Sequence, residues 1–440
     1  MPNLPLGPRS ATLQTIAFAR DPVGTLHKYA HRYGDPFTLK LFTGPIVLTG
    51  MPEGIQEIFT APPQIFASNS VPFLAPLTGE HSVLMLDGAP HRRERALLMP
   101  PFHGARMKAY GALIQDIALR CAAAWQPGRP FMMQAFTQAL SLEVIIKAVF
   151  GARHQEGVQR FSSTVPAYFR AFSPLLVYFP PLRRSFAGIG PWRRFTDVAA
   201  RLEQLLSEEI AAHREDCTHR DDILSLLLAA RYEDGNAMSH EALLDELKTL
   251  LLAGHETTAI ALAWAFYWLH REPDVYDRLQ AELRALGHPP DPDDLVQLPY
   301  LSAVCDEALR LYPVLGAITR RLRQPMTLCG HALPAGIAVG AAIALTHLDP
   351  RLYPDPRCFR PERFLARTYT PFEYLPFGGG ARRCIGAAFA VYEMKIVLGS
   401  ILAQNRLGLV DDKLLHPKPR TFTIGPPGGV RMIYHGPVER

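Results

Sequence analysis

The segment Phe377–Gly386 reads FGGGARRCIG, and the interpretation of the whole chain starts from its single cysteine. Cys384 follows a run of three glycines and two arginines, and it directly precedes residues 386–404, which are predicted to form a helix. Nearby positive charge and a helix N-terminus both favour a thiolate over a thiol. Glycines let the backbone approach a large flat ligand and free its N–H groups to bond the sulfur. The segment therefore indicates a functional thiolate, with an inert buried cysteine as the alternative. It matches a phosphate loop only weakly, because no Gly-Lys-Ser/Thr follows.

The composition narrows the class of protein. The 440 residues are 48% apolar and 20% charged, close to the average for globular proteins. This excludes a disordered chain, a collagen-like fibre and a disulfide-dense mini-protein. The net charge of +5 is too small to imply nucleic-acid binding. Length alone would suggest about three domains. Proline, with 40 residues, is well above its usual share of ~5% and predicts many separate elements.

Neither a disulfide framework nor a secretory signal is recognisable. The six cysteines are widely spaced and form no CxxC pair. The opening MPNLPLGPRS lacks an apolar signal region, so we expect a cytoplasmic protein. The stretch Thr249–His270 is long and apolar enough to span a membrane, but Glu256 would lie in lipid, where a charge is costly. We favour a buried core helix and expect no integral membrane segment.

The hydrophobic pattern predicts a chain dominated by long helices. Two short strands joined at Gly44-Pro45 are predicted over Pro36–Gly50, and strand pairs over Cys329–Leu345. The predicted fold class is mainly α with minor β (α+β), as a single domain over residues 1–440 in which residues 1–10 are flexible. The predicted helices are Arg106–Trp125, Thr137–Val149, Asp197–Arg214, Asp221–Arg231, Ser239–His270, Asp274–Ala285, Leu301–Leu311 and Gly386–Gln404.

The cysteine segment resembles the haem-binding signature of the cytochrome P450 family, Phe-x-x-Gly-x-Arg-x-Cys-x-Gly. It matches at Phe377, Gly380, Arg382, Cys384 and Gly386. Four further motifs occur in the family's order, so the resemblance extends over nearly the whole chain. It implies the P450 fold and a haem b cofactor, with Cys384 as the only metal ligand. Phe377 would pack near the sulfur, Arg382 would pair with a haem propionate, and Gly386 would also contact the cofactor.

Residues Ala253–Thr258, AGHETT, resemble the family's distal helix motif. The resemblance implies that Ala253 and Gly254 make room for dioxygen beside the haem. Thr257 would hydrogen-bond the oxygen being activated, and Glu256 would help to relay protons from solvent. From the residues alone, a kinked core helix with a satisfied carboxylate is the alternative. A zinc helix is discarded, because HExxH would need histidine where Ala259 stands.

Three further motifs complete the resemblance. Glu307 and Arg310 share a helix face and, with Arg363, resemble a structural triad, although an isolated pair would be a solvated surface feature. His91 and Arg95 resemble the propionate-binding helix motif, with a basic solvated helix start as the alternative. Arg320 is a further propionate candidate, and its neighbour Arg321 leaves the register open by one residue.

Electrons must come from outside this chain, since it has no dinucleotide-binding fingerprint and no reductase-sized extension. We expect a ferredoxin or flavodoxin-type donor with a reductase that draws on NAD(P)H. An acidic donor could dock on a basic patch, the alternative being scattered solubilising charge. The patch would comprise Arg92, Arg93, Arg106, Lys108 and Arg383. We expect the protein to be a monomer.

The substrate is expected to be lipophilic. The regions where the family places substrate contacts are apolar here, which favours a fatty acid, terpenoid or polyketide, and no buried charge is evident to anchor a polar ligand. Single apolar residues in these regions could equally be core. The predicted contacts are Phe73, Leu74, Phe172, Ala253, Leu315, Ala317, Ile318 and Phe422.

The sequence thus predicts a haem-thiolate monooxygenase that hydroxylates or epoxidises a lipophilic small molecule with dioxygen and two external electrons. A peroxide-driven peroxygenase or isomerase is the first alternative. The acid–alcohol pair Glu256–Thr257 argues against it, because a proton relay serves dioxygen. A non-enzymatic haem sensor or lipophile carrier is the second alternative.

Overall fold

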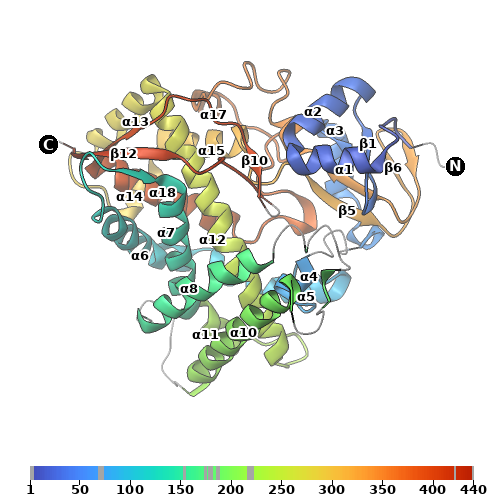
Figure 1. Ribbon diagram of the computed structural model, residues 1–440, viewed down its shortest axis with the longest axis horizontal. Coiled ribbons are helices and arrows are strands. Elements are labelled where there is room, and N and C mark those ends of the chain that lie inside the picture. Colours follow the sequence, from blue (N-terminus) through green and yellow to red (C-terminus); the bar gives the residue numbers. More distant parts are fainter. Residues whose placement is uncertain are drawn as a thin grey trace.

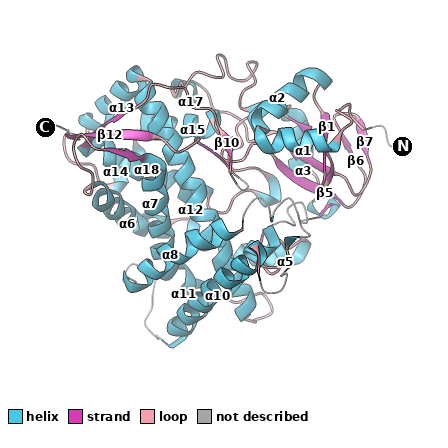
Figure 2. Ribbon diagram, viewed as in Figure 1, coloured by secondary structure: helices cyan, strands magenta, loops and turns pink. Residues whose placement is uncertain are grey.

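The structure is a computed structural model that describes residues 4–67, 74–151, 155–172, 176, 182–184, 189–215, 222–420 and 423–438. Helices make up most of it, and strands form small sheets, the largest of which lies on the N-terminal side of the molecule (Figure 1, Figure 2). A long helix, α12 (His240–Arg271), passes through the middle of the helical part (Figure 1). The mainly α arrangement with minor β agrees with the pattern of the sequence.

The largest sheet has five strands in the order β1-β2-β8-β5-β3. β1 (Phe37–Leu41) and β2 (Gly44–Thr49) form the predicted antiparallel hairpin, whose turn needs the positive φ of Gly44. β2 runs parallel to β8 (Ala338–Ala341), and β8 is antiparallel to β5 (Ile318–Leu322). The short β3 (Phe66–Ala67) closes the edge. The sheet holds β5, which carries Arg320, in a fixed register.

Three smaller sheets lie elsewhere. β12 (Arg431–Pro437) pairs with β4 (Pro130–Met132) and β9 (Asn405–Leu409). β6 (Met326–Leu328) pairs with β7 (His331–Leu333). β10 (Lys418–Pro419) and β11 (Ile424–Gly425) form a short hairpin that lies against α12.

The helices that were predicted agree with the observed ranges to within a few residues, but α1, α2, α3, α4, α8, α14 and α17 were not predicted. The end of Cys329–Leu345 is also helical rather than strand, because Ile343–Thr346 forms α16. The described helices not yet given are α1 (Ala11–Arg20), α2 (Pro22–Tyr33), α3 (Pro52–Thr60), α4 (Ala75–Thr78), α5 (Gly88–Leu98), α6 (Ala105–Ala122), α7 (Met133–Phe150), α8 (Gln155–Ala171), α10 (Pro191–Glu215), α11 (Ile223–Ala229), α13 (Pro273–Ala285), α14 (Pro292–Gln297), α15 (Pro299–Leu311), α17 (Glu362–Ala366) and α18 (Ala387–Gln404).

Many prolines start helices. A proline in the first turn lacks only an N–H that would have no partner there, and its φ already suits the helix. This accounts for part of the proline excess noted in the composition. Such prolines are Pro22, Pro52, Pro273, Pro292 and Pro299, at the starts of α2, α3, α13, α14 and α15.

α12 is a core helix, as predicted. Its C-terminal half is almost wholly buried, with Trp264 fully inaccessible to solvent, and its first turn is capped by Ser239, whose hydroxyl accepts from the N–H of Ala242. Two other helices, α7 and α18, are long and apolar enough to cross a membrane by length and composition, but most of each is buried inside the protein. That burial is what core helices of a globular protein show.

Glu393 is one of the buried carboxyl groups whose pKa is raised. Glu393 of α18 is 1% exposed and accepts a 2.6 Å hydrogen bond from the hydroxyl of Ser141 on α7. Its second oxygen has no partner among the described residues. Burial raises the pKa of Glu393 from 4.5 to about 8. The folded protein therefore holds a proton here that the unfolded chain releases above about pH 4.5.

Glu393→Gln is expected to abolish the loss of folding stability that Glu393 causes in the wild type as the pH rises. The folded pKa is raised, so the contribution of Glu393 is full below pH 4.5 and is lost as pH rises towards 8. Relative to the wild type, the variant should gain on the order of a few kcal/mol between pH 5 and pH 8. Urea unfolding of both proteins at the two pH values measures this. An identical pH dependence in the two proteins would contradict a raised pKa at Glu393.

Candidate active site

The loop before α18 is held tightly against the five-stranded sheet and α3. The N–H of Cys384 donates a 3.0 Å hydrogen bond to the carbonyl of Phe377, which closes the loop. Glycine is required inside it: a Cβ on Gly379 would lie 2.2 Å from the ring of Phe59, and Gly380 has a positive φ of 63°. The glycine run thus fixes the position of Cys384.

Cys384 is surrounded by protein and yet accessible. Its side chain is exposed, yet burial is the main influence on its pKa, which is raised. The exposure and the effect of burial are both expected for a thiol that protein surrounds without covering it. The N–H of Gly386 and the charges of Arg95 and Arg383 act in the opposite direction and favour the thiolate. Burial outweighs these effects, which the sequence led us to expect.

Three arginines and a histidine gather close to one another. His91 and Arg95 lie on α5, Arg320 on β5 and Arg382 beside Cys384. Burial, together with Arg382 and Arg95, lowers the pKa of His91 to about 4, and burial with Arg382 lowers the pKa of Arg320 to about 10. The nearest countercharge is Asp87, whose carboxylate lies 3.1 Å from the Arg382 guanidinium. Such a concentration of positive charge is unfavourable unless an anion joins it.

The structure brings Arg320, rather than Arg321, to this cluster. The Arg320 guanidinium donates a 2.6 Å hydrogen bond to the carbonyl of Gly379, in the cysteine loop. Arg321 instead donates to the carbonyl of Gly336 at 2.7 Å. Successive side chains of a strand point to opposite faces, so only one of the two can face Arg382.

The AGHETT motif lies in the middle of α12. Ala253 is exposed although it stands in a buried helix, and the Thr257 hydroxyl donates to the Ala253 carbonyl. Burial raises the pKa of Glu256, and Arg420, whose Nε lies 3.7 Å from its carboxylate, opposes that rise. Gly254 contacts α7, where a Cβ would come within 2.8 Å of Ile145. The structure therefore gives Gly254 a packing role, and its role in making room for dioxygen stays a prediction.

His255, to which the sequence assigned no role, is a buried residue. Its ring stacks on Phe169 of α8, with centroids 5.5 Å apart. Burial lowers the pKa of His255 to about 4, so the ring is neutral near pH 7.

The predicted substrate contacts separate into three groups. Leu315, Ala317 and Ile318 are half-buried, and Ala253 is exposed. Leu74 and Phe172 are instead buried core residues, and Phe172 packs on Phe195 at 5.0 Å. Their apolar surface is used in packing the helices together. Phe73 and Phe422 lie outside the described residues.

The predicted structural triad is present. Both oxygens of Glu307 accept from Arg310, at 2.6 and 2.8 Å, and Arg363 donates to the same carboxylate at 3.0 Å. Glu307 and Arg310 are 0% exposed, which rules out the solvated-pair alternative. Arg310 also donates to the carbonyl of His347, and the His347 ring accepts from the N–H of Leu375. The triad is thus linked to the segment that leads into the cysteine loop.

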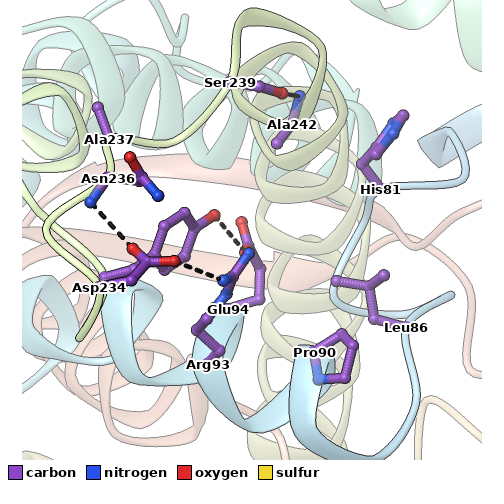
Figure 3. A pocket seen from close by; sticks show the side chains of 11 residues that line it. His81, Leu86, Pro90, Arg93, Glu94, Asp234, Asn236, Ala237, Ser239 and Ala242 are labelled. Carbon is purple, nitrogen blue, oxygen red and sulfur yellow. Dashed lines mark hydrogen bonds and ion pairs between the residues drawn. The ribbon is translucent and has the colours of Figure 1, made fainter.

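One residue of the predicted basic patch, Arg93, has a different environment from the other four. Arg92, Arg106, Lys108 and Arg383 are exposed, but the Arg93 guanidinium lies over the ring of Tyr232 at 4.0 Å. It also pairs with Asp234 at 3.3 Å, beside a pocket of about 240 Å³ that includes Glu94 (Figure 3). The Tyr232 hydroxyl donates to Glu94 at 2.7 Å. Arg93 is therefore directed into this pocket, and its charge is partly neutralised there.

The residues around Cys384 fit a haem. Protein surrounds the accessible thiol of Cys384, and a Cβ built on Gly386, two residues further on, would meet nothing within 4 Å. The three clustered arginines suit the two carboxylates of the porphyrin, and His91 adds a polar ring beside them. An interior thiol, an adjoining cationic cluster and a helix with an exposed small residue at its centre together define a haem-thiolate protein.

Comparison with known proteins agrees. The family model described as Cytochrome P450 matches residues 2–430. Cytochrome P450 138 of Mycobacterium tuberculosis is 36% identical over 91% of this chain and 89% of its own length. Cytochrome P450 135B1 of the same organism is 34% identical over 98% and 91%. The chain belongs to the cytochrome P450 family, whose members are monooxygenases that use haem iron, dioxygen and reducing equivalents from a partner.

Solved structures show the same fold. The retinoic-acid-bound cyanobacterial CYP120A1 has a TM-score of 0.88 and 27% identity, with 99% of this chain and 100% of that chain covered. The haem domain of cytochrome P450DA has a TM-score of 0.86 and 24% identity, with 99% and 98% covered. These matches confirm the predicted P450 fold.

Proposed function

We propose that this chain hydroxylates or epoxidises a lipophilic small molecule, with two electrons delivered by a ferredoxin or flavodoxin-type partner. The observation that carries the proposal is the thiol of Cys384, which is accessible although protein surrounds it and lies beside a cluster of arginines. When haem is bound, it supplies the activation of dioxygen, and a cysteine thiolate on its iron favours O–O cleavage.

Each motif then has a role in binding or in moving protons. Cys384 is the metal ligand, and its thiolate is supported by the N–H of Gly386 and by Arg95. The cationic cluster holds the propionates. Glu256 takes protons from solvent and passes them on, which its raised pKa suits, since it is more readily protonated near neutral pH than an ordinary glutamate. Thr257 completes the relay with its hydroxyl.

The substrate and the donor are inferred from surfaces. The half-buried Leu315, Ala317 and Ile318 offer apolar contacts. A lipophilic substrate is also supported by the structural relative that was solved with retinoic acid. The exposed Arg92, Arg106, Lys108 and Arg383 are suited to docking an acidic electron donor.

The test compares two ways of driving the oxidation: an electron-donor system with dioxygen, and hydrogen peroxide alone. With ferredoxin, ferredoxin reductase and NADPH, the wild type should convert lipophilic substrates, and hydrogen peroxide alone should not support comparable turnover. Thr257→Ala should lower the product formed per NADPH by at least about tenfold and release more peroxide, because the relay loses a hydroxyl. Thr257→Ser keeps the hydroxyl and serves as the control. Product formed only with peroxide would favour the peroxygenase alternative, and no product from either system would favour the carrier.

A further inference from the structure

The hairpin β10–β11 places one arginine beside the central helix. The N–H of Arg420 donates to the carbonyl of Thr423 at 2.8 Å, which closes the turn. The N–H of Ile424 donates to the carbonyl of Val314 at 2.8 Å, so the hairpin is fixed to the segment that contains Leu315 and Ala317. Arg420 therefore belongs to the same part of the molecule as the half-buried apolar residues proposed for the substrate.

The Arg420 side chain follows α12 towards the AGHETT motif. A Cβ on Gly425 would lie 3.2 Å from Cδ of Arg420 and 3.5 Å from the side chain of Ile260. Further along, Nε of Arg420 lies 3.7 Å from the carboxylate of Glu256. Positions 253, 256, 257 and 260 share one helix face. The side chain thus runs along the face that also presents the exposed Ala253 and the hydroxyl of Thr257.

The Arg420 guanidinium has donors to spare. A distance of 3.7 Å is too long for a hydrogen bond, and no described residue accepts one from this guanidinium. Its side chain is 36% exposed, so a ligand can reach it. In the same turn, the hydroxyl of Thr423 is buried and has no partner among the described residues. A guanidinium presents five N–H groups in a fork that matches a carboxylate.

We propose that Arg420 binds the carboxylate of a lipophilic acid and holds its hydrocarbon part against the apolar segment 314–318. The ligand class is a long-chain or isoprenoid carboxylic acid. The inference rests on the proposed function and specifies its substrate. It adds a single polar anchor to the lipophilic substrate expected from the sequence, because Arg420 lies beside α12.

Glu256 does not stand in the way of such a ligand. Its contact with Arg420 is a single long ion pair, and burial raises the pKa of Glu256, so the carboxyl takes up a proton readily when Arg420 turns to another anion. Binding of an acid would then leave Glu256 protonated, the form that can donate a proton.

The experiment measures binding of matched acids and esters to the haem-loaded enzyme by calorimetry. The probes are dodecanoic acid, hexadecanoic acid and all-trans-retinoic acid, each with its methyl ester. For at least one pair, the wild type should bind the acid roughly tenfold more tightly than the ester, as expected for a charge-assisted hydrogen bond. Arg420→Gln should remove this preference by weakening the acid alone, and Arg420→Lys should keep part of it. Arg431→Gln, at an exposed arginine on β12, is the control.

Three results would overturn the inference: esters bound as tightly as acids by the wild type, an unchanged preference in Arg420→Gln, or equal weakening of acid and ester, which would mark a structural role. Failure of the proposed function is recognised separately. In that case the wild type would turn over neither acids nor esters with the donor system, whereas failure of the Arg420 inference alone would leave turnover intact.

Discussion

Cys384→Ser is expected to abolish the red-shifted Soret band of the reduced carbon-monoxide complex and to remove donor-driven turnover. A hydroxyl ionises far less readily than a thiol, and it cannot supply the electron density that a thiolate gives to iron. The Gly386 N–H and the positive charge of Arg95 favour an anion at position 384. They can do so only if the side chain at that position ionises. The loss should exceed the ~10–100-fold decrease that follows removal of a residue behind a metal ligand. Difference spectra and product formation measure it.

The control for this experiment is Cys358→Ser. Cys358 is likewise an exposed free cysteine, but it lies before α17 and not in the loop FGGGARRCIG. Its substitution should leave the spectrum and the turnover unchanged. A red-shifted band that survived in Cys384→Ser would show that another residue is the ligand.

Glu307→Gln is expected to lower the free energy of unfolding by about 3–5 kcal/mol, the range found when one partner of a buried ion pair is removed. The Glu307 carboxylate accepts from Arg310 and Arg363 and from the backbone N–H of Arg360. A glutamine amide would direct its own N–H groups at these donors and leave two buried guanidinium groups without a countercharge. Urea unfolding of the haem-loaded protein measures the change.

Asp411→Asn provides the comparison. Asp411 pairs with Arg431 at 3.1 Å, but both side chains are more than half exposed, so the change should cost less than about 1 kcal/mol. If Glu307→Gln were as mild as Asp411→Asn, the triad would not be a principal support of the fold. Haem content should fall in Glu307→Gln, since the His347–Leu375 contact connects the triad to the cysteine loop.

Local patterns were enough to predict much of the fold. The apolar run around Trp264 predicted α12, and the Gly44 turn predicted the β1–β2 hairpin. α8 was missed because Pro166 stands inside it, where proline argues against a helix, and neighbouring helices must compensate. α2 was missed because its buried face is narrow, with Pro22, Thr25 and Leu26 as its buried residues.

The site was predicted less completely, because its geometry depends on contacts between distant segments. The sequence motifs identified Cys384 and Glu307 directly. Which of Arg320 and Arg321 faces Arg382 depends instead on the register of β5 in its sheet. Phe172 was assigned to the substrate because it lies in a region where the family places substrate contacts, and its packing on Phe195 of α10 shows that it is buried in the core. The approach of Arg420 to Glu256 joins two segments far apart in the chain that no local pattern connects.

The cluster of Arg95, Arg320 and Arg382 makes assembly of this protein depend on the supply of an anionic cofactor. Without an anionic partner, these charges repel one another inside the molecule and oppose the compact state. A ligand that binds only the folded chain stabilises it by mass action. In a cell short of haem, a larger fraction of newly made chains would therefore remain open to proteases, so the abundance of this enzyme would follow the availability of iron and porphyrin.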